Sequence, residues 1–133
     1  MAFSLTVVVG VTAGCSAPPT SGEGWRKIGG LDADQAMFQF VEIDEAHLTH
    51  RATYDEAVAA LCSSGGSCQI AFFAPGDRVP PIGMERGEFF RQGGWRDYNE
   101  LAYYWEDEFT KWDCERAGST NAPRGATCGS TGQ

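Results

Sequence analysis

Two histidines and two carboxylates lie within seven residues of each other, and this group has the side chains best suited to chemistry. His47 and His50 are three residues apart, a spacing that puts both imidazoles on one face of a helix, with Asp44 or Glu45 as a further metal ligand. Such a set would suit a small exported hydrolase, possibly metal-dependent, that uses these histidines and nearby carboxylates. The spacing differs from the His-Glu-x-x-His pattern of zinc peptidases. We therefore expect a solvated loop here and no cofactor, and we keep the hydrolase as the alternative function.

Other catalytic patterns are missing from the sequence. There is no Gly-x-Ser-x-Gly motif, and Gly65-Gly66 lacks the following lysine of a phosphate-binding loop. The acidic run from Glu106 to Glu108 would point in several directions on a helix, so its members would not all reach one cation. The sequence thus favours a protein that is not an enzyme.

Aromatic residues are concentrated in the second half of the chain, where Trp95, Tyr103, Tyr104 and Trp105 lie close together in sequence. Tyrosine and tryptophan combine apolar area with a polar tip, which suits contact with a protein or a glycan. Two interpretations stay open for these four residues. They fill the core, or they form a surface that binds a protein or cell-wall partner.

Five cysteines indicate where the protein is located. Leaving Cys15 aside, Cys62, Cys68, Cys114 and Cys128 are an even number in an apparently exported chain, which predicts two disulfides with three possible pairings. We favour the pairs 62–68 and 114–128, because both close short polar loops.

The first fourteen residues have the features of a signal peptide. They carry no charge and contain an apolar run from Phe3 to Val11, shorter than the roughly 20 residues that span a bilayer. The stretch from Thr12 to Cys15 resembles the lipobox of bacterial lipoproteins, in which the cysteine is acylated and becomes the mature N-terminus. We expect a membrane anchor on Cys15 and a cell-envelope protein that faces the periplasm or exterior. Ordinary secretion and a buried N-terminal strand are the alternatives.

All charged residues follow Cys15, so the net charge of −8 belongs to the mature domain. An acidic protein repels phosphate backbones and gains nothing from counterion release, which argues against nucleic-acid binding. Membrane contact is expected only through the lipid.

The 133 residues fit one domain. After the signal peptide (1–14), proline, glycine and serine dominate residues 15–30, which we expect to be a flexible tether. The folded domain is expected at 31–128, followed by a disordered tail at 129–133.

The expected elements begin with a strand from Met37 to Asp44, covered on both faces because its apolar residues keep no single phase. A helix follows from Thr53, with Thr53 and Glu56 as a capping box. A buried strand from Gln69 to Phe73 completes a β-α-β unit.

Further along, we expect a short helix from Met84 to Gln92 and a second helix from Asp97 to Glu108. A closing strand from Phe109 to Glu115 would be tied to the tail by a disulfide. The fold class is therefore α+β: a small single domain stabilised by disulfides.

One resemblance covers roughly residues 38–114. A helix that ends in cysteine, the segment Cys68 to Phe73, the downstream pair Tyr98-Asn99 and the triplet Trp112 to Cys114 are similar to a group of small exported proteobacterial domains with no assigned activity. The resemblance implies fold and compartment and transfers no catalytic residue. The leading expectation is a non-catalytic envelope lipoprotein or exported accessory module that binds its partner through an aromatic surface.

Overall fold

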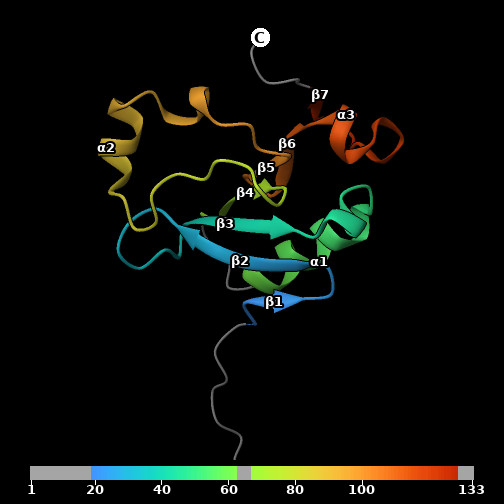
Figure 1. Ribbon diagram of the computed structural model, residues 1–133, viewed down its shortest axis with the longest axis horizontal. Coiled ribbons are helices and arrows are strands. Elements are labelled where there is room, and N and C mark those ends of the chain that lie inside the picture. The colour runs from blue at the N-terminus through green and yellow to red at the C-terminus, as the bar shows by residue number, and fades with distance from the viewer. Residues whose placement is uncertain (1–18, 63–66, 129–133) are drawn as a thin grey trace, which may run out of the picture.

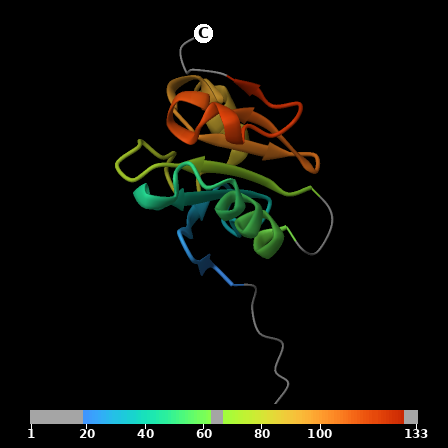
Figure 2. The same cartoon turned by 90° about the vertical axis from the view of Figure 1, so that its right-hand side faces the viewer.

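A computed structural model describes residues 19–62 and 67–128 of the chain. These residues form one small α+β domain built on a mixed sheet, with α1 on one face and α2 on the other (Figures 1 and 2). The expected signal peptide, Cys15 and the expected C-terminal tail lie outside the described residues.

The strands follow one another in the sheet in the order in which they occur in the sequence. They are β1 (Ser21–Gly22), β2 (Trp25–Gly30), β3 (Phe38–Ile43), β4 (Gln69–Phe73), β5 (Ala102–Trp105), β6 (Glu108–Trp112) and β7 (Thr127–Cys128). Strands β3 and β4 are parallel, as are β6 and β7, and the other neighbours are antiparallel. The helices are α1 (Arg51–Leu61), α2 (Arg86–Arg91) and α3 (Cys114–Ala117), with 3-10 turns η1 (Glu45–His47), η2 (Gly94–Asp97) and η3 (Ser119–Asn121).

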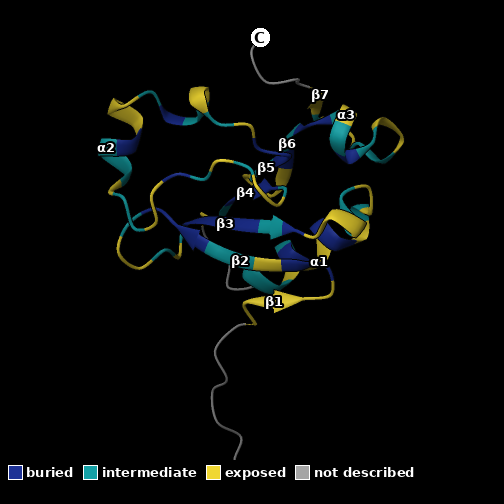
Figure 3. Cartoon of the chain, in the orientation of Figure 1, coloured by how far each residue is buried: buried dark blue, intermediate teal, exposed yellow. Residues whose placement is uncertain are grey.

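The parallel pair β3 and β4, connected through α1, confirms the predicted β-α-β unit. Both strands are buried over most of their length (Figure 3). Successive residues alternate between the faces, so Phe40 packs on the α2 side and Val41 on the α1 side. This alternation explains why the apolar residues of β3 keep no single phase in the sequence.

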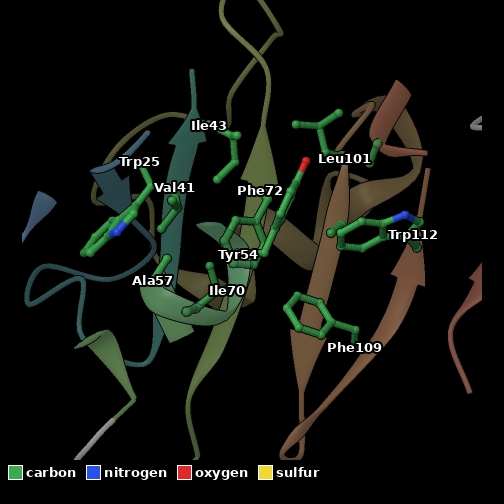
Figure 4. Close-up of a cluster of buried hydrophobic side chains, with 12 residues drawn as sticks. Trp25, Val41, Ile43, Tyr54, Ala57, Ile70, Phe72, Leu101, Phe109 and Trp112 are labelled. Carbon is green, nitrogen blue, oxygen red and sulfur yellow. The ribbon is translucent and has the colours of Figure 1, made fainter. Parts of the chain in front are cut away.

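The α1 face holds the larger cluster of buried side chains. Tyr54 from α1 lies beside Phe72 of β4, with Phe109 and Trp112 of β6 next to it (Figure 4). The Tyr54 hydroxyl donates a hydrogen bond to the Leu48 carbonyl at 2.7 Å. The helix is thus joined to the sheet by aromatic packing, and the hydrogen bond ties it to the segment that precedes it.

The α2 face holds a second, smaller cluster. Its fully buried members are Leu31, Phe38, Phe40, Ala71, Phe73 and Phe89. The predicted short helix is confirmed as α2, whose first turn is capped by the Glu85 carboxylate accepting from the Gly87 N–H at 3.1 Å. Because α2 has only six residues, loops and η2 close the rest of this face.

Both favoured disulfides are present. Cys62 bonds to Cys68 at the end of α1, and Cys114 bonds to Cys128, which joins α3 to β7. Each closes a short loop, because the bonded cysteines are only 6 and 14 residues apart in sequence.

The expectation of a flexible tether at 15–30 is wrong for the residues of this range that the structure describes. Residues 25–30 form β2, which pairs along its length with β3 and buries Trp25. The glycines that suggest a linker are required by close packing: a Cβ on Gly30 would lie 2.3 Å from the Phe38 carbonyl oxygen. The domain therefore begins about ten residues earlier than expected, at β1.

The second helix expected from Asp97 to Glu108 is also wrong. This stretch forms η2, a connecting loop and the β5–β6 hairpin, whose turn residues Glu106 and Asp107 have φ of 51° and 66°. The aromatic residues of this stretch fit the spacing of a helix and also the alternation of a strand. Pairing with β4 decides in favour of the strand. The closing strand is present as β6, but it ends at Trp112 and α3 follows.

Helix α1 begins two residues before the expected capping box. His50 is the residue before the helix, and Thr53 is buried in the first turn, donating its backbone N–H to the His50 carbonyl at 3.0 Å. The turn η1 comes directly before the helix, and the His50 N–H donates a hydrogen bond to the His47 carbonyl at 2.9 Å. Because the chain is already turned there, the helix begins without a hydrogen bond from a side-chain cap.

Candidate binding surface at the β5–β6 hairpin

The four aromatic residues proposed for partner binding do not form one surface. Alternation along β5 sends Tyr103 to the α2 face and Tyr104 to the α1 face. Trp95, in η2, joins Tyr103 on the α2 face, and Trp105 lies at the exposed end of β5. Half of the predicted set is therefore structural.

Trp95 is the centre of the aromatic packing on the α2 face. Its ring lies within 4.9 to 6.4 Å, centroid to centroid, of the rings of Phe40, Phe73, Phe89, Tyr98 and Tyr103. Rings at such separations attract one another in edge-on and tilted arrangements. Trp95 therefore serves to close this face, and it is not free for a partner.

Tyr103 is held in the same packing. Its hydroxyl donates a hydrogen bond to Gln69 Oε1 on β4. Burial raises the pKa of Tyr103 to about 12; the nearby Trp95 indole lowers it in part, and the Glu100 carboxylate raises it. This phenol stays neutral at physiological pH and contributes to the core.

Tyr104 and Trp105 belong to the part of the hairpin that faces solvent. The Tyr104 ring lies 5.3 Å from that of Phe109 across the hairpin, and burial, followed by the charge of Asp107, raises the pKa of its phenol. Trp105 is 44% exposed, which is high for the largest apolar side chain. Two acidic turn residues follow it directly, so apolar area and negative charge lie side by side.

Two hollows flank this hairpin. The groove on the α1 side is lined by Arg51, Asp55 and Val58 of α1, by Tyr104, Asp107, Glu108 and Phe109 of the hairpin, and by Pro123 and Arg124. A second hollow is lined by Ser67, Cys68, Trp105, Glu106 and Asp107. A partner that covers the hairpin would therefore meet two concave regions.

The groove on the α1 side has an aromatic floor and a rim of both charges. The Arg51 guanidinium lies 5.4 Å from the centre of the Phe109 ring and pairs with Asp55 at 3.3 Å. Its lining contains no serine, cysteine or histidine that could act as a nucleophile or base. Such a surface can make apolar contact and ionic hydrogen bonds, which are the elements of recognition.

The histidine cluster forms a separate shallow hollow, lined by Glu23, His47, His50, Ala52, Thr53 and Glu56. The two imidazole rings are stacked edge to face at 5.2 Å, and His47 lies against the backbone of Gly24. Asp44 is exposed, and its backbone carbonyl accepts a hydrogen bond from the His47 N–H at 2.8 Å. Packing against Gly24 therefore fixes the position of the His47 ring.

Neither a metal centre nor a membrane-spanning segment is found in the described part of the chain. Across 19–62 and 67–128, no three His, Cys, Asp or Glu side chains are placed to hold a metal ion. None of the helices in these ranges is long and apolar enough to cross a bilayer.

Reasoning from the sequence missed Arg51, Phe109 and Arg124 as members of the groove. A signal for the hairpin was present: the aromatic stretch from Ala102 to Trp105, two acidic residues, and the alternating stretch from Glu108 to Trp112. It was overlooked because hairpin turns of this type usually contain glycine or asparagine, and here they contain glutamate and aspartate.

A second exposed apolar region lies on the α2 side, where Ile82 is 54% and Phe90 is 50% exposed. Phe90 packs edge-on against Phe38 and Phe89, so only its outer half contacts solvent. This region serves below as the control for the hairpin.

No protein-family model, no curated protein and no solved structure matches the chain. Its function must therefore be inferred from the geometry of the hairpin and the groove.

Proposed function

We propose that this chain is a non-catalytic envelope lipoprotein of a bacterium, or an exported accessory module, that binds a protein or cell-wall partner through the hairpin surface. This surface consists of Tyr104, Trp105, Glu106, Asp107 and the groove beside them. The observation that carries the proposal is the exposure of Trp105, 44%, between two hollows.

An exposed tryptophan beside a groove is a common anchor in protein interfaces. Tryptophan, tyrosine and arginine are the residues that most often dominate binding energy, and all three types occur here. The surrounding carboxylates and Arg124 would form a polar rim around the apolar contact. The surface thus has the composition of an interface.

The disulfides are compatible with a location outside the cytoplasm, where such bonds persist. The proposal adds a lipid on Cys15. Five residues separate Cys15 from β1, and at full extension they span only about 17 Å. An acylated Cys15 would therefore hold the β1 edge close to the membrane.

The strand order then supports an outward position for the hairpin. Strand β1 forms one edge of the sheet, and β5 and β6 lie near the other (Figure 1). Four strand spacings separate β1 from β5, on the order of 20 Å. A domain tethered at β1 would present the hairpin away from its anchor.

Photo-cross-linking tests the surface directly. A photoreactive amino acid replaces the exposed Glu108, which pairs with Trp105 across the hairpin, in one variant and Phe90 in a control, so that Trp105 itself is kept. Cells are irradiated, and the cross-linked products are identified by mass spectrometry. We expect a discrete protein adduct, or adducts to cell-wall fragments, at position 108 and none at position 90. Equal or absent labelling at both positions contradicts the proposal.

Trp105→Ala and Phe90→Ala provide a second test with the partner found by cross-linking. Trp105→Ala should weaken binding about 30-fold or more, the effect of losing roughly 2 kcal/mol at an interface anchor. Phe90→Ala should leave the affinity unchanged. We avoid Tyr103→Ala, because Tyr103 is part of the core.

Intact mass spectrometry of the protein purified from its host membranes tests the lipid. We expect a mature chain that begins at Cys15 and carries acyl groups, and Cys15→Ser should release the protein from the membrane fraction. A chain that begins at Met1 would refute the lipoprotein proposal and leave the hairpin proposal standing.

A further inference from the structure

The two disulfides differ in how well the protein surrounds them. Cys62 and Cys68 are half-buried against the α1 cluster, and Cys68 Sγ accepts a hydrogen bond from the Gln39 side chain at 3.6 Å. In the second disulfide, Cys114 is half-buried while Cys128 is exposed. The Cys128 sulfur is therefore the one that a reductant in solution reaches most readily.

The segment that carries Cys128 has few other contacts. Residues 124 and 125 and both residues of β7 are exposed, and Ala126 alone is partly buried against the core. Strand β7 pairs with β6 at only two positions. A strand this short is not stable by itself, because few hydrogen bonds offset the ordering of its backbone.

The chain is anchored just before this segment. Pro123 is buried, and the Asn121 side chain donates a hydrogen bond to the Thr49 carbonyl. The Arg51 guanidinium donates to the Asn121 carbonyl at 3.5 Å. Release of the segment would therefore stop at residue 123 and would leave η3 and the α1 cluster in place.

Strand β6 is the element that β7 covers. Its five residues run from Glu108 to Trp112, and β7 pairs with Lys111 and Trp112. In the described structure the outer edge from Glu108 to Thr110 has no strand partner. Loss of β7 would lengthen this uncovered edge from three residues to five, the usual length of a strand that pairs with another chain.

We infer that the Cys114–Cys128 disulfide is a redox-sensitive latch that holds residues 124–128 on the sheet, and that its reduction uncovers the edge of β6 without unfolding the domain. The inference does not rest on the partner proposed for the hairpin, although release of the segment would take Arg124 out of the groove wall.

The chemistry is thiol–disulfide exchange with a dithiol reductant. One thiolate of the reductant attacks Cys128 Sγ, forms a mixed disulfide and displaces the Cys114 thiolate, which takes up a proton. The second thiolate of the reductant then attacks the mixed disulfide and releases the Cys128 thiolate, which is protonated in turn. The dithiol is oxidised to a disulfide, and the protein gains two thiols.

A reductant titration of the folded wild-type protein is the first test. Increasing dithiothreitol is followed by alkylation and peptide mapping. We expect Cys114 and Cys128 to be alkylated at a dithiothreitol concentration at least tenfold lower than Cys62 and Cys68. Simultaneous reduction, or earlier reduction of the 62–68 bond, overturns the inference.

Amide hydrogen exchange is the second test, with Cys114→Ser/Cys128→Ser compared with the wild type. We expect amides of residues 125–128 to exchange at least tenfold faster in the variant, while those of β3 and β4 keep their protection. Unchanged protection at Thr127 shows that β7 docks without the bond and overturns the latch. Loss of protection throughout the sheet also overturns it, because the bond would then support the whole fold.

Discussion

The cluster on the α1 face has twelve buried residues, two of them (Tyr54 and Ala57) from an eleven-residue helix, whereas the cluster on the α2 face has six and is closed by a six-residue helix, a 3-10 turn and loops. The main cover of the first cluster is one continuous helix, with Ala117 of α3 beside it. The cover of the second cluster is made of short pieces joined by aromatic contacts around Trp95. The same sheet is thus stabilised in two different ways.

This difference shows how a small domain can cover a sheet without a long helix. Aromatic rings bury much area for each residue and cost little side-chain entropy, so a few of them replace a helix face. The short elements leave gaps at their margins, and Ile82 and Phe90 are exposed there. We expect the α2 face to tolerate change better than the α1 face.

The largest effect is expected from two adjacent residues of β4, Phe72 and Phe73. Both are fully buried, but Phe72 packs against Tyr54 on the α1 face and Phe73 against Trp95 on the α2 face. Each change to alanine should lower the free energy of unfolding by about 3 to 5 kcal/mol. We expect Phe72→Ala to cost more, because a long helix relaxes less around a cavity than loops do. Urea unfolding measures both, and a larger loss for Phe73→Ala would refute the comparison.

Alkaline pH should weaken both faces through their buried tyrosines. Burial raises the pKa of Tyr103 to about 12 and raises that of Tyr54 as well, compared with about 10 in an unfolded chain. As the pH rises, the phenol groups lose their protons in the unfolded chain before they do so in the folded protein. The contribution of the two tyrosines to the free energy of unfolding is therefore complete below pH 10 and is lost as the pH rises toward 12. For Tyr103 it is on the order of 2 kcal/mol. Urea midpoints measured from pH 8 to 11.5 should fall, and Tyr103→Phe should reduce the slope; a flat profile contradicts this.

Removing single hydroxyl groups should show a smaller difference between the faces. Tyr54→Phe leaves the Leu48 carbonyl without its 2.7 Å hydrogen bond next to the core, and should cost about 1 to 2 kcal/mol. Tyr103→Phe frees Gln69, which is half-exposed and can bind water, so the cost should stay below about 1 kcal/mol. Thermal unfolding compares the two variants, and equal losses would show that both carbonyl groups reach water.

The smallest effects on the free energy of unfolding are expected at two exposed side chains, Trp105 of the hairpin and Phe90 on the α2 face. Trp105→Ala and Phe90→Ala should each change the free energy of unfolding by no more than about 0.5 kcal/mol. The comparison separates binding from folding, since Trp105 is proposed to contact a partner. A loss above about 1 kcal/mol for Trp105→Ala would assign this residue to the fold.

The sequence was sufficient for the elements with strong local signals. The β3–α1–β4 unit, α2 and both disulfides follow from apolar runs, a cysteine at each loop end and the glycine-rich sequence after α1. The bonded cysteines, for example, are only 6 and 14 residues apart in sequence. Local reasoning therefore succeeds where the determinants themselves are local.

Local reasoning from the sequence fails where contacts between distant residues decide the structure. Gly29 and Gly30 indicate a linker until Ile82 is placed beside Gly29 and the Phe38 carbonyl beside Gly30, and only then is the lack of a side chain a packing requirement. Tyr103 and Tyr104 suit a helix or a strand until pairing with β4 supplies hydrogen bonds. The candidate groove joins α1, the hairpin and residue 124, and no spacing in the sequence brings these together.

The order of strands in the sheet has a consequence for how this protein is made. Each strand pairs with the one before it in the chain, and the two parallel pairs are joined by crossovers, β3–β4 through α1 and β6–β7 through α3 and η3. A chain that crosses a membrane N-terminus first can therefore add one strand at a time to the growing sheet, without waiting for a distant segment to emerge. Cys114 and Cys128 are the last pair to meet, so closure of their bond marks the end of vectorial folding.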